Sequence, residues 1–150
     1  MGVMACIGSE KLTKDRIRAN KVFSANLVSE SLLHLADYLG NTEGYNKEKM
    51  DIPIEIEHGA VLNVPVLKDS PWVFELEVKQ SIPLDDSEVY LCKIRNTLVA
   101  KELKDHSISV EERLRMAASV MWIESQKDVQ PTGRRNARAG KTAGRIDIMT

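Results

Sequence analysis

Hydrophobic and polar residues alternate through the middle of the chain, which is the pattern of strands that have one buried and one solvated face. The clearest run is residues 72–79, where one face takes Trp72, Phe74, Leu76 and Val78 and the other takes Val73, Glu75, Glu77 and Lys79. Alternation at residues 52–56 and strand-like runs at residues 3–7, 21–27 and 89–98 predict further strands. The pattern therefore predicts a mainly antiparallel sheet.

Three segments have the spacing of short helices instead, near residues 13–20, 29–39 and 109–121. Ser29 can cap the second of these, and Gly40 follows it, as glycine often follows a helix. Ser109 and Glu112 form a capping box at the start of the third, in which each side chain satisfies a free backbone N–H group. We therefore expect a sheet accompanied by a few short helices.

A polar turn joins the strand at residues 3–7 to the first helix and carries Ser9, Lys11, Thr13 and Lys14. The free backbone N–H groups in the first turn of a helix attract anions, so such a turn can hold a phosphate. Lys11 would add positive charge and Thr13 a hydroxyl donor. The same residues also fit ordinary helix capping by serine or threonine, and the pattern leaves both interpretations open.

Size, charge and cysteine content narrow the class of protein. With 150 residues and 43% apolar content the chain can bury one ordinary core, and its net charge of −1 argues against nucleic-acid binding. Cys6 and Cys92 lie in apolar runs, where a free thiol behaves as a small hydrophobe, although a disulfide between them is the alternative. No histidine or cysteine lies at metal-ligand spacing, and no apolar run approaches the ~18 residues of a membrane span. We expect a cytoplasmic protein with reduced thiols and no metal site.

The order of the elements, with particular residues in each, resembles the flavin reductase family, whose members bind FMN in a split β-barrel. The family pattern is a basic residue and a threonine that open a helix, then Phe-x-x-Asn in a strand, then a helix that runs into Asp-Tyr-x-Gly. The matching residues here are Lys11, Thr13, Phe23, Asn26, Asp37, Tyr38 and Gly40. The resemblance covers roughly residues 3 to 103 and implies a mainly β fold: an antiparallel split barrel of Greek-key type with a few short helices.

The same resemblance implies an oxidoreductase that binds FMN and passes a hydride to flavin from NAD(P)H, as a homodimer. It implies cofactor-binding positions at Ser9, Lys11, Thr13, Lys14, Asn26, Thr42 and Lys47. Thr42 and Lys47 lie in a loop that corresponds to one near the flavin phosphate, and a plain connecting loop is the alternative. Asn26 would lie near the ring or ribityl chain, unless its amide simply closes a strand end. Ser87 stands about where the family often has a histidine, so no catalytic residue is assigned.

Both ends of the sequence differ from the family pattern. Family members usually have two barrel strands before the strand at residues 3–7, so we expect an incomplete barrel domain over residues 1–123, with an edge strand that favours association with another chain. Residues 124–150 are rich in arginine and glycine and poor in apolar groups, which predicts a basic, poorly ordered tail. The alternative function is a non-catalytic flavin-binding or interaction protein with the same fold.

Overall fold

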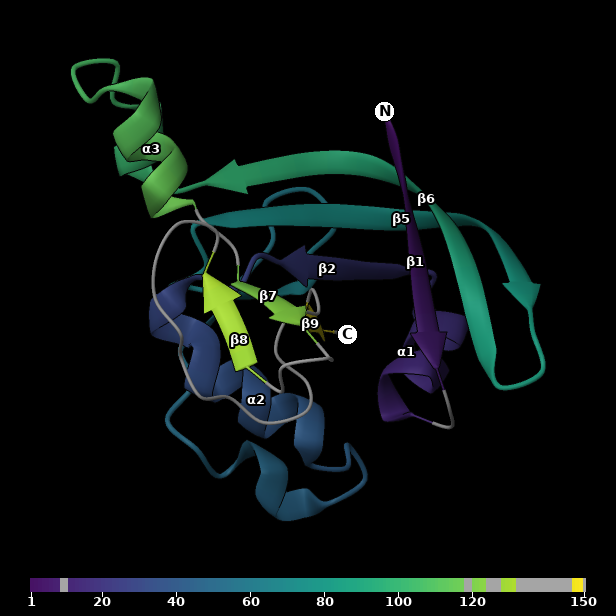
Figure 1. The fold of residues 1–150 in the computed structure, drawn as a ribbon. Coiled ribbons are helices and arrows are strands. Elements are labelled where there is room, and N and C mark those ends of the chain that lie inside the picture. The colour runs from purple at the N-terminus through teal and green to yellow at the C-terminus, as the bar shows by residue number, and fades with distance from the viewer. Residues whose placement is uncertain (9–10, 118–119, 124–127, 132–146, 150) are drawn as a thin grey trace.

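The main element of the fold is a five-stranded antiparallel sheet in the order β1–β6–β5–β2–β9 (Figure 1). A computed structural model describes residues 1–8, 11–117, 120–123, 128–131 and 147–149. The strands of this sheet are β1 (Gly2–Gly8), β2 (Val22–Asn26), β5 (Trp72–Pro83), β6 (Ser87–Val99) and β9 (Asp147–Met149). The long β5–β6 hairpin lies between β1 and β2, and the sheet does not close into a barrel within the described residues. The predicted mainly antiparallel sheet is therefore confirmed.

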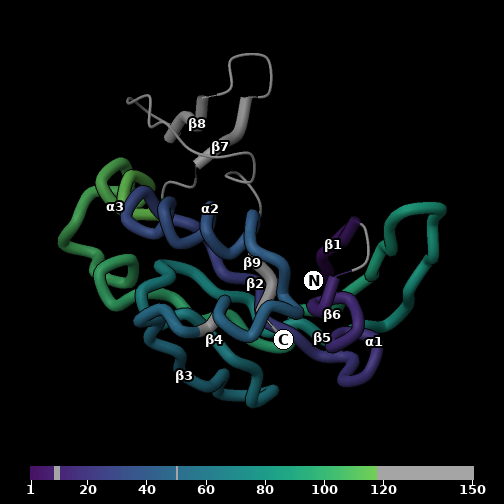
Figure 2. The backbone as a smooth tube through the Cα atoms, turned by 90° about the horizontal axis from the view of Figure 1, so that it is seen from below, coloured from purple at the N-terminus to yellow at the C-terminus, as the bar shows by residue number. Residues whose placement is uncertain are grey.

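Shorter elements surround this sheet. Two further antiparallel pairs are β3 (Ile56–His58) with β4 (Pro65–Leu67), and β7 (Val120–Ile123) with β8 (Asp128–Pro131). The α-helices are α1 (Leu12–Asn20), α2 (Leu33–Asn41) and α3 (Val110–Met116). Single 3₁₀ turns occur at η1 (Glu30–Leu32), η2 (Lys47–Met50) and η3 (Lys101–Lys104). Figure 2 shows β4 alongside β2, so the β3–β4 pair covers part of the sheet.

All three predicted helices are present near the predicted positions, but the bounds of two of them differ from the prediction. The second helix begins with the 3₁₀ turn η1 and contains Gly40 in its last turn, whereas Gly40 was expected just beyond its end. The third begins where predicted, and one bond of its capping box is present: the Ser109 hydroxyl oxygen accepts from the Glu112 N–H at 3.1 Å. It ends at Met116 rather than at residue 121, because residues 120–123 pair with β8 as a strand.

The strand predicted over residues 52–56 is also wrong for most of its length. Only Ile56 belongs to a strand, and the backbone N–H of Ile54 donates to the Ile52 carbonyl at 2.8 Å, which closes a tight local turn. Pro53 lies between them and has no N–H to donate to a neighbouring strand. The apolar spacing at these positions therefore does not reflect a sheet face.

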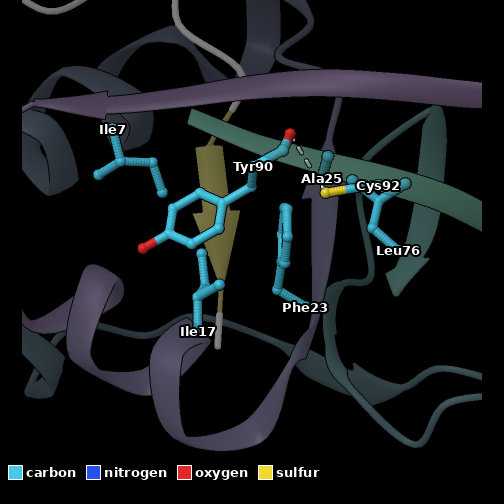
Figure 3. Packing of buried hydrophobic residues seen from close by; sticks show 7 residues of the cluster. All are labelled: Ile7, Ile17, Phe23, Ala25, Leu76, Tyr90 and Cys92. Carbon is cyan, nitrogen blue, oxygen red and sulfur yellow. Dashed lines mark hydrogen bonds between the residues drawn. The ribbon is translucent and has the colours of Figure 1, made fainter. Parts of the chain in front are cut away.

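Apolar side chains fill the space between α1 and the sheet (Figure 3). Ile17 points from α1 toward the sheet and is 0% exposed, as are Phe23 on β2 and Tyr90 on β6. The cluster is completed by Ile7, Ala25, Leu76 and Cys92. Helix α1 therefore rests on the strands through a closed apolar contact, which fixes its position relative to the end of β1.

Polar side chains hold the β3–β4 pair on the opposite face of β2 and β5. Glu75 is 0% exposed, and its carboxylate accepts from the backbone N–H groups of Ala60 at 2.9 Å, Val61 at 3.0 Å and Leu62 at 2.6 Å. The Asn96 amide donates to the same carboxylate at 2.7 Å. Burial alone would raise the pKa of Glu75, but these hydrogen bonds outweigh it and hold the pKa below its usual value. Alternation had placed Glu75 on the solvated face, and that expectation is wrong.

Candidate functional site

Helix α1 begins at a lysine, so a positive charge lies at its N-terminus. Lys11 is the N-cap residue, with an extended backbone at φ −129° and ψ 141°, and no side chain caps the helix through it. The carbonyl of Lys11 accepts from the N–H groups of Lys14 at 2.9 Å and Asp15 at 3.3 Å. The N–H of Lys14 is therefore used within the helix and is not free for a phosphate. What remains is a helix start without a side-chain acceptor, beside a lysine, which suits an anion.

The predicted phosphate ligands differ in their access to solvent. Lys11 and Thr13 are partly exposed at the start of α1. Lys14 was predicted as a phosphate ligand, but it is 3% exposed and interacts within the protein. Its ammonium group therefore does not face solvent. Ser9 lies outside the described residues. The structure therefore leaves Lys11 and Thr13 as the accessible pair.

The loop that carries Thr42 and Lys47 lies against the start of α1. A Cβ atom on Gly44 would come within 2.9 Å of the Leu12 Cβ, so only glycine allows this close approach. The hydroxyl of Tyr45 donates to the Asp15 carboxylate at 2.5 Å. This bond holds the carboxylate of Asp15, which lies in the first turn of α1. The structure thus brings together two predicted segments that are separated by about thirty residues in sequence.

The loop itself is fixed by Lys49, which sequence reasoning did not single out. Its Nζ donates to the carbonyl oxygens of Leu39 at 2.5 Å and Thr42 at 3.0 Å. A lysine on these carbonyls stabilises the C-terminal end of α2. Thr42 is partly exposed and Lys47 is exposed, so Lys47 is the second accessible cation of this region.

Asn26 lies elsewhere and makes other contacts. It is 0% exposed; its Oδ1 accepts from the Leu67 N–H at 2.9 Å, and its Nδ2 donates to the Ser24 hydroxyl oxygen at 3.0 Å. The Ser24 hydroxyl in turn donates to the Pro65 carbonyl at 2.5 Å. Both polar atoms of Asn26 are therefore used to hold β4 on β2. This geometry favours the interpretation in which the amide closes a strand end over the one in which it contacts the flavin.

An ion pair beneath α1 fixes the direction in which the helix points. Arg18 donates from Nε to the Glu88 carboxylate at 2.7 Å, although the two residues lie on different elements. Glu88 is 5% exposed. Burial would raise the pKa of Glu88, but the hydrogen bond from Arg18 helps to hold it below its usual value. Ser87, one residue earlier, pairs with Gly8 at the end of β1, so it lies beside the turn that leads into α1.

Two classes of site find no support in the part of the chain that the structure describes. These residues contain no group of three or more His, Cys, Asp or Glu side chains that could hold a metal ion. Among the same residues no helix is both long and apolar enough to cross a membrane. Cys6 and Cys92 are both free thiols, Cys6 exposed and Cys92 buried.

Comparison with known proteins identifies relatives of this fold. The family model described as "Flavin reductase like domain" matches residues 1–116. No curated protein gives a significant sequence match. The structure is similar to that of flavoredoxin from Methanosarcina acetivorans, with a TM-score of 0.74 and 15% identity over 94% of this chain and 74% of that one.

Two further solved structures are similar over a smaller part. One is an FMN-binding protein from Thermus thermophilus, with a TM-score of 0.62 and 19% identity over 68% of this chain and 57% of that one. The other is an NADH:FAD oxidoreductase from Streptomyces globisporus C-1027, with a TM-score of 0.59 and 13% identity over 67% of this chain and 60% of that one. This chain thus spans less than two thirds of either protein. The likenesses confirm the predicted split-barrel fold class.

Proposed function

This chain belongs to the flavin reductase-like family, and we propose that it binds FMN and passes a hydride from NAD(P)H to the flavin. The observation that carries the proposal is the start of α1, where Lys11 and Thr13 lie at a helix N-terminus without a side-chain cap and the loop at residues 42–47 lies alongside. An FMN-binding protein and an NADH:FAD oxidoreductase among the similar structures support a flavin and a nicotinamide as ligands.

The residues at this position have the chemistry that a phosphate monoester requires. The helix start offers backbone N–H donors, Lys11 a positive charge and Thr13 a hydroxyl donor. Tyr45 donates to the Asp15 carboxylate and holds that side chain in place. Lys47 on the neighbouring loop would add a second charge. Asn26 and Lys14 are buried and belong to the supporting structure rather than to this site.

Bound flavin would itself supply the redox chemistry, by accepting a hydride and giving it up again. The task of this chain would be to hold the phosphate and so set the direction of the rest of the cofactor. Ile17 and the Arg18–Glu88 pair keep α1 fixed on the sheet, so the phosphate would be held by a helix that cannot tilt freely. A homodimer and a cytoplasmic location complete the proposal.

We expect the double variant Lys11→Ala, Thr13→Ala to bind FMN about tenfold to a hundredfold more weakly than the unmodified protein. One hydrogen bond to a charged phosphate is worth on the order of 1.5–3 kcal/mol, a factor of about ten to a hundred, and we count the partly exposed pair Lys11 and Thr13 as one such bond. Riboflavin has the same ring but no phosphate, so its affinity should hardly change. Quenching of flavin fluorescence on titration with protein measures both affinities.

Arg16→Ala is the matched control, because it removes an exposed charge from the same helix but away from its first residues. Its FMN affinity should stay within about twofold of the original, since an exposed charge contributes little. Equal weakening of FMN and riboflavin in the double variant would place the phosphate elsewhere. Failure of the unmodified protein to bind FMN would end the proposal.

The non-catalytic alternative is favoured by one observation, the sheet that stays open within the described residues. An open sheet gives a flavin ring less protection from water than a closed barrel. Oxidation of NADH and NADPH at 340 nm with FMN present separates the two functions. A protein that binds FMN but consumes neither nicotinamide would be a flavin-binding protein only.

A further inference from the structure

The loop between α2 and η2 is held together by its own hydrogen bonds. The N–H of Asn46 donates to the Glu43 carbonyl at 3.1 Å, and the Asn46 side-chain oxygen accepts from the Glu48 N–H at 3.0 Å. Lys49 donates to two carbonyl oxygens around the C-terminal end of α2. Residues 42–49 therefore have a shape of their own, and the contacts at the tip of the loop set its position on α1.

The tip of this loop meets the first turn of α1 at two neighbouring residues. Gly44 packs so closely against the helix that a Cβ atom on it would lie 2.9 Å from the Leu12 Cβ. Tyr45 is 56% exposed, and its hydroxyl donates to the Asp15 carboxylate at 2.5 Å. Leu12 and Asp15 lie on one side of α1, because residues three apart in a helix are neighbours on its surface. The loop therefore forms a wall along one side of the helix start.

The Asp15 carboxylate is held from its other side as well. Its Oδ1 lies 3.9 Å from Nη1 of Arg18, and the Nε of Arg18 donates to Glu88 on β6 at 2.7 Å. Together with Tyr45 these residues form a polar chain that runs from the loop across α1 to the sheet. A connected polar network of this kind holds its members in one arrangement. Asp15 is therefore a fixed acceptor, and the bond from Tyr45 fixes the loop.

We propose that Tyr45 is a specificity-determining residue of the phosphate site, because it fixes the loop of residues 42–47 as a second wall and so favours a terminal phosphate over one that continues into a second nucleotide. The inference rests on the proposed function, which places the flavin phosphate at the start of α1. Tyr45 is a positioning residue in this role. Its hydroxyl is bonded to Asp15, and Thr42 and Lys47 would face the phosphate in its place.

A phosphate monoester gains more from a two-sided site than a phosphate within a dinucleotide does. The phosphate of FMN ends the molecule, and a monoester of this kind has three acceptor oxygens and a charge of about −1.5 to −2 near pH 7. The same phosphate in FAD has one free oxygen fewer, because that oxygen bonds the next phosphate, and it carries less charge. Lys11 and the helix start offer donors on one side, and Lys47 offers a charge on the other. Both sides are needed to satisfy the third oxygen.

We expect Tyr45→Phe, which keeps the ring and removes the hydroxyl, to lower the ratio of FMN affinity to FAD affinity about tenfold. FMN should bind more weakly, whereas riboflavin, which has no phosphate, should bind as before. Gly44→Ala should act in the same direction without touching this hydrogen bond, since its Cβ would push the loop away from Leu12. Isothermal titration calorimetry measures the three affinities in each protein.

Ser107→Ala is the matched control. It too removes a hydroxyl that donates to an aspartate at the surface, with Asp105 as the acceptor at 2.7 Å, but on the segment before α3. The affinities for FMN, FAD and riboflavin should all stay unchanged in this variant. An equal fall of the FMN to FAD ratio in the control and in Tyr45→Phe would overturn the proposal.

Lys47 tests whether Tyr45 acts through the loop. Lys47→Ala should weaken FMN binding about threefold in the original protein, as expected for an exposed charge, but hardly further when Tyr45→Phe is already present. Additive losses, an unchanged FMN to FAD ratio in Tyr45→Phe, or an equal weakening of riboflavin would overturn the inference. The proposed function fails by a different result, namely unaltered FMN binding in the double variant of Lys11 and Thr13.

Discussion

Replacement of Glu75 by alanine is expected to lower the free energy of unfolding by about 3–4 kcal/mol. The variant leaves the N–H groups of Ala60, Val61 and Leu62 and the amide of Asn96 without their acceptor. Each unsatisfied donor costs about 1 kcal/mol or more when water cannot replace the lost partner fully. Urea unfolding followed by tryptophan fluorescence measures the loss.

Glu77→Ala is the matched control, because Glu77 lies on the same strand but forms its ion pairs with Lys79 and Arg95 at the surface. Exposed pairs of this kind contribute about 0–1 kcal/mol, so this variant should remain close to the original stability. A similar loss in both variants would mean that the β5 strand tolerates no change of charge, and that the bonds to the turn at residues 60–62 are not the cause.

The contribution of Glu75 should also depend on pH. The pKa of this carboxyl is lower in the folded protein than its ordinary value of 4.5. Its ionised form therefore stabilises the fold fully above pH 4.5, and this stabilisation is lost as the pH falls through the lower, folded value. Glu75→Gln has no such group, so its stability should fall less steeply in acid. Unfolding curves between about pH 7 and pH 3 compare the two proteins.

Replacement of Phe23 by alanine is expected to cost about 3–5 kcal/mol of stability. Phe23 is 0% exposed, and in Figure 3 its ring lies within the cluster that includes Tyr90, Leu76 and Ile17. Truncation leaves a cavity that a rigid sheet cannot fill by relaxing. Since Ile17 belongs to the same cluster, the variant should also loosen α1 and weaken FMN binding at its start.

Phe23→Leu separates packing from any other role of this ring. It keeps most of the apolar volume and should cost about 1.5 kcal/mol or less. The same urea titration measures both variants. Equal losses for alanine and leucine would contradict the cavity argument and would point to a specific need for the aromatic ring.

The elements that the sequence predicted correctly are those whose apolar spacing matches their environment in the fold. Helix α1 buries Ile17 on one side and exposes Arg16 and Asn20 on the other, so its period was visible. The strands β5 and β6 were predicted for the same reason. At residues 52–56 the isoleucines alternate by chance around Pro53, and no side-chain pattern shows that the backbone turns there.

Tertiary contacts explain the predictions that were wrong. Glu75 looked like a solvated residue because glutamate is seldom buried, and only the turn at residues 60–62 supplies the donors that make its burial stable. Asn26 matched a family motif, and of its two interpretations, a position near the flavin or an amide that closes a strand end, its bonds to Ser24 and Leu67 favour the second. In both cases the decisive partner lies far away in sequence.

The candidate site was predictable in part. Lys11 and Thr13 could be found because a helix start follows a strand within a few residues. The sequence could not show that Lys14 turns inward, nor that Tyr45 would reach Asp15 across thirty positions. A glycine in a polar loop, Gly44, was the one local signal of the close approach to Leu12.

The distance in sequence between β1 and β6 has a consequence for the order of events during protein synthesis. β1 is made first, but its only partner among the described strands runs from Ser87 to Val99. β1 therefore has no strand to pair with until those later residues have left the ribosome. Arg18 likewise waits for Glu88. A nascent chain thus could not gain stability from a cofactor at α1 until β6 has emerged.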